Sequence, residues 1–177
     1  MKNNKKTIFG VVIIILIVLG ILFLFSKNQD KPFNQKSFKG NNLVFNKTKI
    51  NYLDTLIFAG LQELNIENTS ILILPLNKNI EGDIELQAHI RQTDGGFIIW
   101  IAELNRMQNI EVISHELIHL QQYSNKDLIL TEENKTLIYK DIKYEVGNLP
   151  SYDSRPWETE AFAKQEDLKT KIKNILY

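Results

Sequence analysis

The first feature of the hydrophobic pattern is an uninterrupted apolar run over residues 8–25. As a helix it would come close to spanning the hydrocarbon layer of a membrane, and it does not end in the small residues of a signal-peptide cleavage site. Several lysines precede the run, whereas Lys27 and Lys31 after it are partly offset by Asp30. We therefore predict a retained transmembrane anchor, with residues 1–7 in the cytoplasm and the remaining chain periplasmic or extracellular. A cleaved signal peptide is the alternative.

A polar segment over residues 26–48 separates this run from the rest of the chain. It is rich in Asn, Lys and Gln and is interrupted by Pro32 and Gly40, so we expect a linker with a short strand over residues 43–45 at its end. Residues 49–177 remain, and this length is enough for one domain with its own hydrophobic core.

Within that domain the period of the hydrophobic pattern changes from helix to strand. Apolar residues recur at helical spacing over residues 49–65, and the short apolar run over Ser70–Leu76 predicts a strand buried on both faces. Strict alternation over Gly82–Gln92 predicts a half-buried strand. The turn signal Asp94–Gly96 joins it to another strand over residues 97–102, so these two strands are expected to form a hairpin.

Helical spacing returns around Ile113–Tyr123, where the apolar residues lie on one side of the helix. After this helix, residues 127–131 and 136–144 flank a polar turn and predict a second hairpin. A last helix is expected from Pro156, which suits a first helical turn, almost to Tyr177. Together these elements predict an α+β domain in which a small mixed or antiparallel sheet packs on the two later helices.

Candidate chemistry lies in the helix around Ile113–Tyr123, which contains the pattern His-Glu-x-x-His. Side chains four residues apart project from the same side of a helix, so the imidazoles of His115 and His119 can reach one zinc ion. Glu116 is placed to take a proton from a water molecule at the metal and to pass it to a leaving amine. The alternative is a solvent-exposed histidine pair that arose by chance in an amphipathic helix.

The overall composition excludes several other classes of function. Lysine plus arginine and aspartate plus glutamate each number 21, so the formal net charge of zero argues against a nucleic-acid-binding protein. The chain has no cysteine. Disulfides, thiolate zinc ligands and a cysteine nucleophile are therefore all excluded.

Other polar residues are weaker candidates for a site. His89 falls on the polar side of its strand, where an exposed histidine is more common than a metal ligand. Tyr152 and Arg155 lie in an irregular stretch and are candidates to donate a hydrogen bond to a tetrahedral oxyanion, although loop aromatics more often pack. Glu158 and Glu160 lie in the first turn of the last helix, where carboxylates also stabilise a helix N-terminus.

The segment His115-Glu116-Leu117-Ile118-His119, followed on a later helix by Trp157-Glu158-Thr159-Glu160-Ala161, resembles the gluzincin group of zinc metallopeptidases. The resemblance implies a minimal, single-domain zincin-like fold in which a glutamate on the later helix is the third zinc ligand. The pattern Glu-x-Glu-Ala-Asp of membrane-associated gluzincins favours Glu158 as this ligand, with Glu160 as the alternative.

The chain departs from the gluzincin pattern at one position. Phe162 stands where the group has an aspartate that orients a histidine ligand, so this partner must come from elsewhere or be missing. Two other zincin groups fit less well. The metzincin pattern has a glycine and a histidine where this chain has Gln122 and Asn125, and Asp127 lacks the motif that surrounds an aspartate ligand.

The expected function is therefore a membrane-anchored zinc metallopeptidase, with Glu116 as general base and a protein or peptide outside the cytoplasm as substrate. An extended substrate is expected to bind by strand addition at the edge of the first hairpin. The alternative from another functional class is a catalytically inactive zincin-fold binding module at the cell envelope, which would hold a partner at the same edge.

Overall fold

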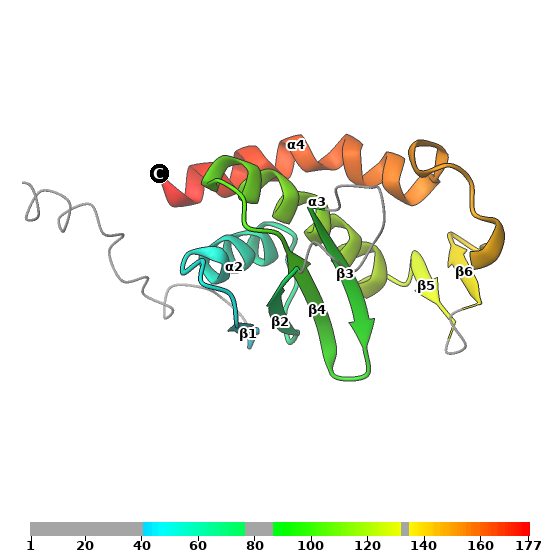
Figure 1. Ribbon diagram of the computed structural model, residues 1–177, viewed down its shortest axis with the longest axis horizontal. Coiled ribbons are helices and arrows are strands. Elements are labelled where there is room, and N and C mark those ends of the chain that lie inside the picture. Colours follow the sequence, from blue (N-terminus) through cyan, green and yellow to red (C-terminus); the bar gives the residue numbers. More distant parts are fainter. Residues whose placement is uncertain (1–40, 77–86, 132–134) are drawn as a thin grey trace, which may run out of the picture. The chain divides into compact units, whose positions relative to one another are not determined.

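The computed structural model describes residues 41–76, 87–131 and 135–177. The predicted anchor over residues 8–25, most of the predicted linker and the first part of the strand predicted over Gly82–Gln92 lie outside the described residues. The described residues contain no helix that is long and apolar enough to cross a membrane. They form a mixed α+β fold with three α-helices and two separate sheets. Figure 1 shows how these elements are arranged.

The larger sheet has four strands in the order β1-β2-β4-β3. Strands β1 (Leu43–Asn46), β2 (Ser70–Pro75) and β4 (Gly96–Ile101) are parallel, and β3 (Ala88–Thr93) lies antiparallel to β4 at the edge. The hairpin predicted around Asp94–Gly96 is thus confirmed as β3–β4. The short strand predicted at residues 43–45 is confirmed as β1, and the end of the predicted linker is therefore part of the sheet.

The turn between β3 and β4 depends on a glycine. Gly96 has a φ of 140°, and a Cβ at this position would lie 2.1 Å from the backbone oxygen of Ser70 on the neighbouring β2. Only glycine combines this conformation with such a close approach. The turn therefore holds the edge strand β3 in register with the parallel part of the sheet.

Helices α2 (Leu53–Glu63) and α3 (Arg106–Ser124) pack on one face of this sheet, and α4 (Pro156–Leu176) packs across both helices (Figure 1). Fully buried side chains of the sheet, such as Ile71 and Ile99, point into this helical layer. The prediction that β2 is buried on both faces was wrong, because Leu72 and Leu74 alternate with the buried positions and are partly exposed. Only the helix-facing side of β2 belongs to the core.

Helices α2 and α3 approach each other closely because α2 has a glycine at the contact. A Cβ on Gly60 would lie 2.2 Å from Cδ1 of Leu117, a fully buried side chain of α3.

The N-terminus of α3 is fixed separately by a capping box. Asn105 accepts a hydrogen bond from the Gln108 backbone N–H at 3.0 Å, and the Gln108 side chain accepts one from the Asn105 N–H at 3.2 Å.

The smaller sheet is antiparallel and consists of β5 (Leu128–Leu130), β6 (Thr136–Tyr139) and β7 (Ile142–Glu145). The sequence correctly predicts the β5–β6 hairpin. The prediction of one strand through residues 136–144 was wrong, because Lys140 and Asp141, with φ of 45° and 68°, form a tight turn that splits it. Lys-Asp is not one of the sequences that usually signal such a turn.

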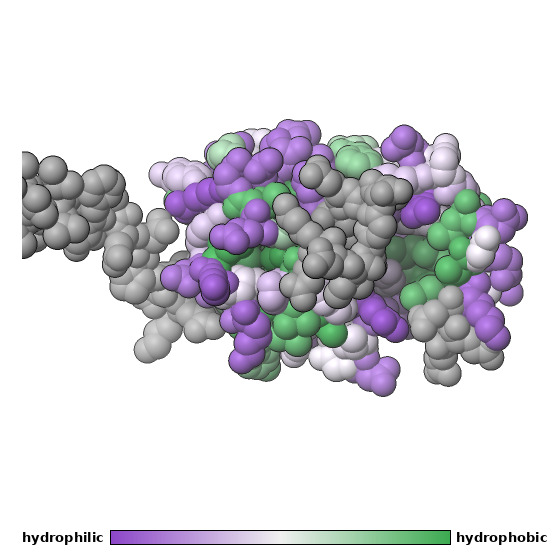
Figure 2. Space-filling view, viewed as in Figure 1, coloured by the Kyte–Doolittle hydropathy of each residue, from purple (hydrophilic) through white to green (hydrophobic). Residues whose placement is uncertain are grey.

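The smaller sheet has its own apolar cluster, formed by Leu128, Leu137, Tyr139 and Trp157. Trp157 belongs to the first turn of α4, so this cluster joins the smaller sheet to the beginning of that helix. Exposed hydrophobic residues also lie on the smaller sheet, including Ile129 on β5 and Ile142 on β7. Figure 2 shows hydrophobic surface over this part of the molecule.

Candidate metal centre

Helix α3 carries the His-Glu-x-x-His pattern and confirms the helix predicted there. Its apolar side, which includes the fully buried Ile110, Ile113, Leu117 and Leu120, packs into the main core. This packing fixes the rotation of the helix about its axis. As a result His115 and His119 point away from the core side toward α4, where they are only 8% and 7% exposed.

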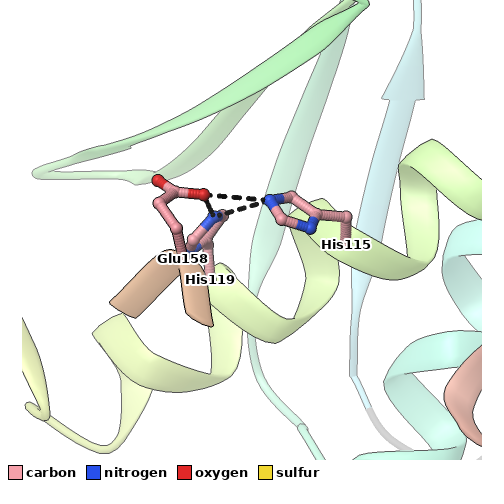
Figure 3. Close-up of side chains that lie close together, drawn as sticks. All are labelled: His115, His119 and Glu158. Carbon is pink, nitrogen blue, oxygen red and sulfur yellow. Dashed lines mark hydrogen bonds and ion pairs between the residues drawn. The ribbon is translucent and has the colours of Figure 1, made fainter. Parts of the chain in front are cut away.

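Two nitrogen atoms and one oxygen atom meet between α3 and α4, as Figure 3 shows. Nε2 of His115 and Nε2 of His119 lie 3.1 Å apart, and each lies 3.2 Å from Oε2 of Glu158. A tetrahedral zinc ion with ligand distances of about 2.0–2.1 Å sets its ligand atoms about 3.3 Å apart. The spacing and the donor types therefore fit a single metal ion, with room for a fourth ligand.

The outer nitrogen of each histidine also has a partner. Nδ1 of His119 lies 2.9 Å from Oε1 of Gln122, and Nδ1 of His115 lies 3.0 Å from Oε1 of Gln165. An amide oxygen only accepts hydrogen bonds, so both partners favour the tautomer with the proton on Nδ1. In that tautomer the lone pair of each Nε2 faces the site.

Glu116 lies beside the ligands and is 5% exposed. Burial raises the pKa of its carboxyl group, and the nearby charges of His119 and His115 only partly counteract this. The polar backbone of Ile90 on the edge strand β3 also lies near Glu116 and slightly lowers its pKa. The group is therefore a buried carboxyl beside the candidate metal position, and β3 runs next to it.

Glu158 and His119 influence each other's protonation. Burial by itself would raise the pKa of Glu158, but its close contacts with Nε2 of His115 and Nε2 of His119, the charge of His119 and the nearby Tyr152 hydroxyl hold it well below its usual range. Burial by itself would lower the pKa of His119, but the hydrogen bond with Glu158 and the charge of Glu116 raise it. The two shifts have a common cause, because the charged forms of Glu158 and His119 stabilise each other when no metal is bound.

Glu160, the alternative third ligand, lies on another side of α4. Its Oε1 accepts a hydrogen bond from Lys164 at 2.6 Å, and its Oε2 accepts from Gln122 at 3.1 Å and from the Tyr139 hydroxyl. Lys140 is a further ion-pair partner at 3.3 Å. These partners outweigh burial and lower the pKa of Glu160 to about 2. Glu160 therefore joins α4 to the smaller sheet, and the structure brings only Glu158 to the histidines.

Tyr152, in a short 3-10 helix just before α4, reaches the site. Burial first, and then the charge and hydrogen bond of Glu158, raise the pKa of the Tyr152 phenol. Arg155 does not join the ligands. Its guanidinium lies 5.4 Å above the ring of Tyr152, and its Nε donates to the backbone oxygen of Pro150 at 3.1 Å. Arg155 therefore supports Tyr152.

His89 and Asp127 are not members of the ligand group. His89 stacks on Trp100 with ring centroids 4.5 Å apart, on the side of the sheet opposite to the buried Ile99. Asp127 lies in the connection between α3 and β5, where its backbone bonds to Gln122 and Lys140. In the structure, therefore, neither residue lies with His115, His119 and Glu158.

Three residues near the site were not predicted as functional: Gln122, Gln165 and Tyr123. Gln122 is on the histidine side of α3, and Gln165 lies seven residues after Glu158, so helical spacing contained a signal for both. Tyr123 is a partly buried neighbour. Burial and the charges of Glu116 and Glu158 raise the pKa of its phenol to about 12.

The chain matches no protein-family model, no curated protein and no solved structure.

Proposed function

We propose that this protein is a zinc-dependent metallopeptidase with a minimal gluzincin fold. The observation that carries the proposal is the buried triangle of His115, His119 and Glu158 with the Glu116 carboxyl beside it. Two imidazoles and one carboxylate are a typical ligand set of catalytic zinc, which keeps a fourth position for water or substrate. A solvent-exposed chance pair would have neither the third ligand nor the hydrogen-bonded outer nitrogens.

A zinc ion held by these three side chains would lower the pKa of a water molecule and polarise the carbonyl group of a peptide bond. The chain's own residues would complete the reaction. Glu116, the buried carboxyl group beside the ligands, would take a proton from the water and give it to the leaving amine. The Tyr152 hydroxyl, close to Glu158, is the candidate donor to the oxyanion.

The edge strand β3 is the candidate binding element for substrate. Among the described strands it pairs only with β4, and it packs against α3, with the backbone of Ile90 near the Glu116 carboxyl. An extended protein or peptide that adds to this edge would pass in front of the metal position. We further propose that residues 8–25 anchor the enzyme in a membrane, with its domain outside the cytoplasm.

The test measures zinc and hydrolysis on the same protein. The full chain, purified in mild detergent, should contain about one zinc ion per molecule and cleave an unstructured protein such as casein. A chelator should stop cleavage, and added zinc should restore it. His115→Ala should lose both zinc and cleavage, whereas His89→Ala, matched in residue type, should keep both.

Two outcomes would contradict the proposal in different ways. If neither the wild-type protein nor its variants retain zinc when zinc is supplied in excess, the metal centre itself is wrong. If zinc is bound but a wide panel of unfolded proteins and peptides is not cleaved, the catalytically inactive binding module becomes the better explanation.

A further inference from the structure

Both histidines of the candidate metal centre are oriented by glutamines, and the two glutamines are not equivalent. Gln122 accepts from Nδ1 of His119, and its amide nitrogen donates to the backbone oxygen of Trp157 at 3.0 Å and to Glu160 at 3.1 Å. All these contacts require the amide nitrogen to face α4 and the amide oxygen to face the histidine. Gln122 therefore has to be an amide, because a carboxylate could accept from His119 but could not donate the other two hydrogen bonds.

Gln165 is bound more simply. Among the described residues, its side chain has one recorded hydrogen bond, from Nδ1 of His115 at 3.0 Å. No acceptor for its amide nitrogen is recorded in that part of the chain. A carboxylate at this position could accept the same hydrogen bond without leaving a broken contact behind.

The position of Gln165 on α4 explains how it reaches His115. Glu158, Phe162 and Gln165 are spaced by four and then three residues, so they lie along one side of the helix. Helices α3 and α4 run antiparallel, since His115 is opposite Gln165 and Gln122 is opposite Trp157. Gln165 thus comes to lie next to the histidine nearer the N-terminus of α3.

Phe162, between Glu158 and Gln165, contacts the same histidine. Its ring centroid lies 4.7 Å from that of His115, with the ring planes inclined by 52°. Phe162 has no hydrogen-bond acceptor, so it can restrict the imidazole ring by packing but cannot hold a proton on Nδ1. The hydrogen bond has to come from the next turn of the helix.

We propose that Gln165 is the positioning residue of His115: it keeps the proton on Nδ1 and the lone pair of Nε2 directed at the metal. This inference rests on the proposed function, because it assumes that the triangle binds zinc. A neutral acceptor increases the basicity of a histidine ligand less than a carboxylate does. Zinc affinity is therefore set below the level that a carboxylate at position 165 would give.

The experiment compares zinc affinities of full-length variants by competition with a chromogenic chelator. Gln165→Leu should weaken zinc binding about 10- to 100-fold, as is usual when the outer partner of a ligand is removed. Gln165→Glu should restore the hydrogen bond and bind zinc about tenfold more tightly than wild type. The matched control is Gln121→Leu, the same substitution on α3 at a residue outside the ligand group, which should leave zinc affinity unchanged.

A substitution of Gln122 tests whether the two glutamines differ in their roles. Gln122→Glu places a carboxylate 3.1 Å from the position of Glu160 and removes both donated hydrogen bonds. It should weaken zinc binding, in contrast to the same substitution at Gln165. If Gln165→Glu and Gln122→Glu change the affinity in the same direction, the proposed difference between the two residues is wrong.

A spectroscopic readout separates positioning from general structural damage. In zinc-loaded protein labelled with ¹⁵N-histidine, the Nδ1 proton of His115 should be visible and slow to exchange. In Gln165→Leu it should exchange much faster, while that of His119 stays protected. If wild type binds zinc and Gln165→Leu changes neither the affinity nor this proton, the inference alone is overturned. If wild type does not bind zinc, the proposed function is overturned with it.

Discussion

Helix α3 has two buried sides, and they are buried by different chemistry. On one side Ile110, Ile113 and Leu117 are fully buried among apolar neighbours, and their contribution comes from removing apolar surface from water. On the other side His115 and His119 are almost as buried, but each polar atom has a partner on α3 or α4. The apolar side holds the helix in place, and the polar side is available for chemistry only because α4 completes it.

The largest expected effect concerns a residue on the polar side. Glu116→Gln preserves shape but cannot accept a proton from water at neutral pH, so hydrolysis should fall about 10²- to 10⁴-fold. The free energy of unfolding should not fall, because burial already disfavours the ionised form of Glu116. Turnover of casein and thermal unfolding of the zinc-loaded variant check both parts. Near wild-type turnover would show that another group is the base.

The opposite behaviour is expected on the apolar side. Leu117→Ala removes a fully buried side chain that packs against Gly60, so it should lower the free energy of unfolding by about 2–5 kcal/mol. Folded molecules of this variant should still bind zinc, because the ligands belong to the other side of the helix. Urea unfolding and zinc titration well below the midpoint measure the two quantities. A variant of wild-type stability that loses zinc would contradict the separation of the two sides.

These two sides also differ in how far the sequence predicts them. The apolar side of α3 follows from a hydrophobic period, the last helix from the helix-start signal at Pro156, and the β3–β4 hairpin from a turn signal, each within one segment. Gln165 does not, because its role exists only once α3 and α4 lie antiparallel. The Lys140–Asp141 turn was missed for a local reason, since neither residue is a usual signal for positive φ.

The choice between Glu158 and Glu160 as the third candidate ligand can be predicted from the sequence only in part. Helical geometry predicts that Glu158 and Glu160 cannot both face one metal, because two residues correspond to a rotation of about 200°. It does not predict which one turns inward. In the structure this depends on Tyr139 and Lys140 of the smaller sheet, which bind Glu160 from the other side. The choice therefore depends on an element far from the motif in sequence.

A paired substitution tests this assignment. Glu158→Gln should weaken zinc binding at least 100-fold, because it removes a charged ligand. Loss of an outer hydrogen-bond partner of a ligand costs up to about 100-fold, and loss of the ligand itself should cost more. Glu160→Gln should change zinc affinity less than tenfold, since it acts only through Gln122. Its main effect should be to lower the free energy of unfolding by about 1–2 kcal/mol, because the hydrogen bonds to Tyr139 and Lys164 become weaker. A loss of zinc confined to Glu160→Gln would reverse the roles of the two glutamates.

The smallest effect is a pH dependence that should change sign when zinc is added. In the zinc-free protein the pKa of His119 is raised above 6.5, so its contribution to stability is complete below pH 6.5 and is lost as the pH rises through the raised value. The raised pKa of Glu116 acts in the same direction, but its contribution to stability begins to be lost already above about pH 4.5. The lowered pKa of Glu158 contributes stability above about pH 4.5 that is lost only in stronger acid. The zinc-free protein should therefore become less stable from pH 6.5 toward pH 8, by about 1.4 kcal/mol for each pH unit up to the raised pKa of His119.

Zinc competes with the proton on His119, so zinc affinity should increase over the same pH range in which the zinc-free protein loses stability. The measurement is thermal unfolding between pH 5 and pH 8 with and without excess zinc, and the increase in Tm on adding zinc should grow with pH. Glu158→Gln is the control, because it removes the main partner that raises the pKa of His119 and should flatten the zinc-free curve. A zinc-free protein that gains stability from pH 6.5 to pH 8 would show that His119 and Glu158 do not share a proton. The polar side of α3 would then be held together by neutral hydrogen bonds, as its outer partners Gln122 and Gln165 already are.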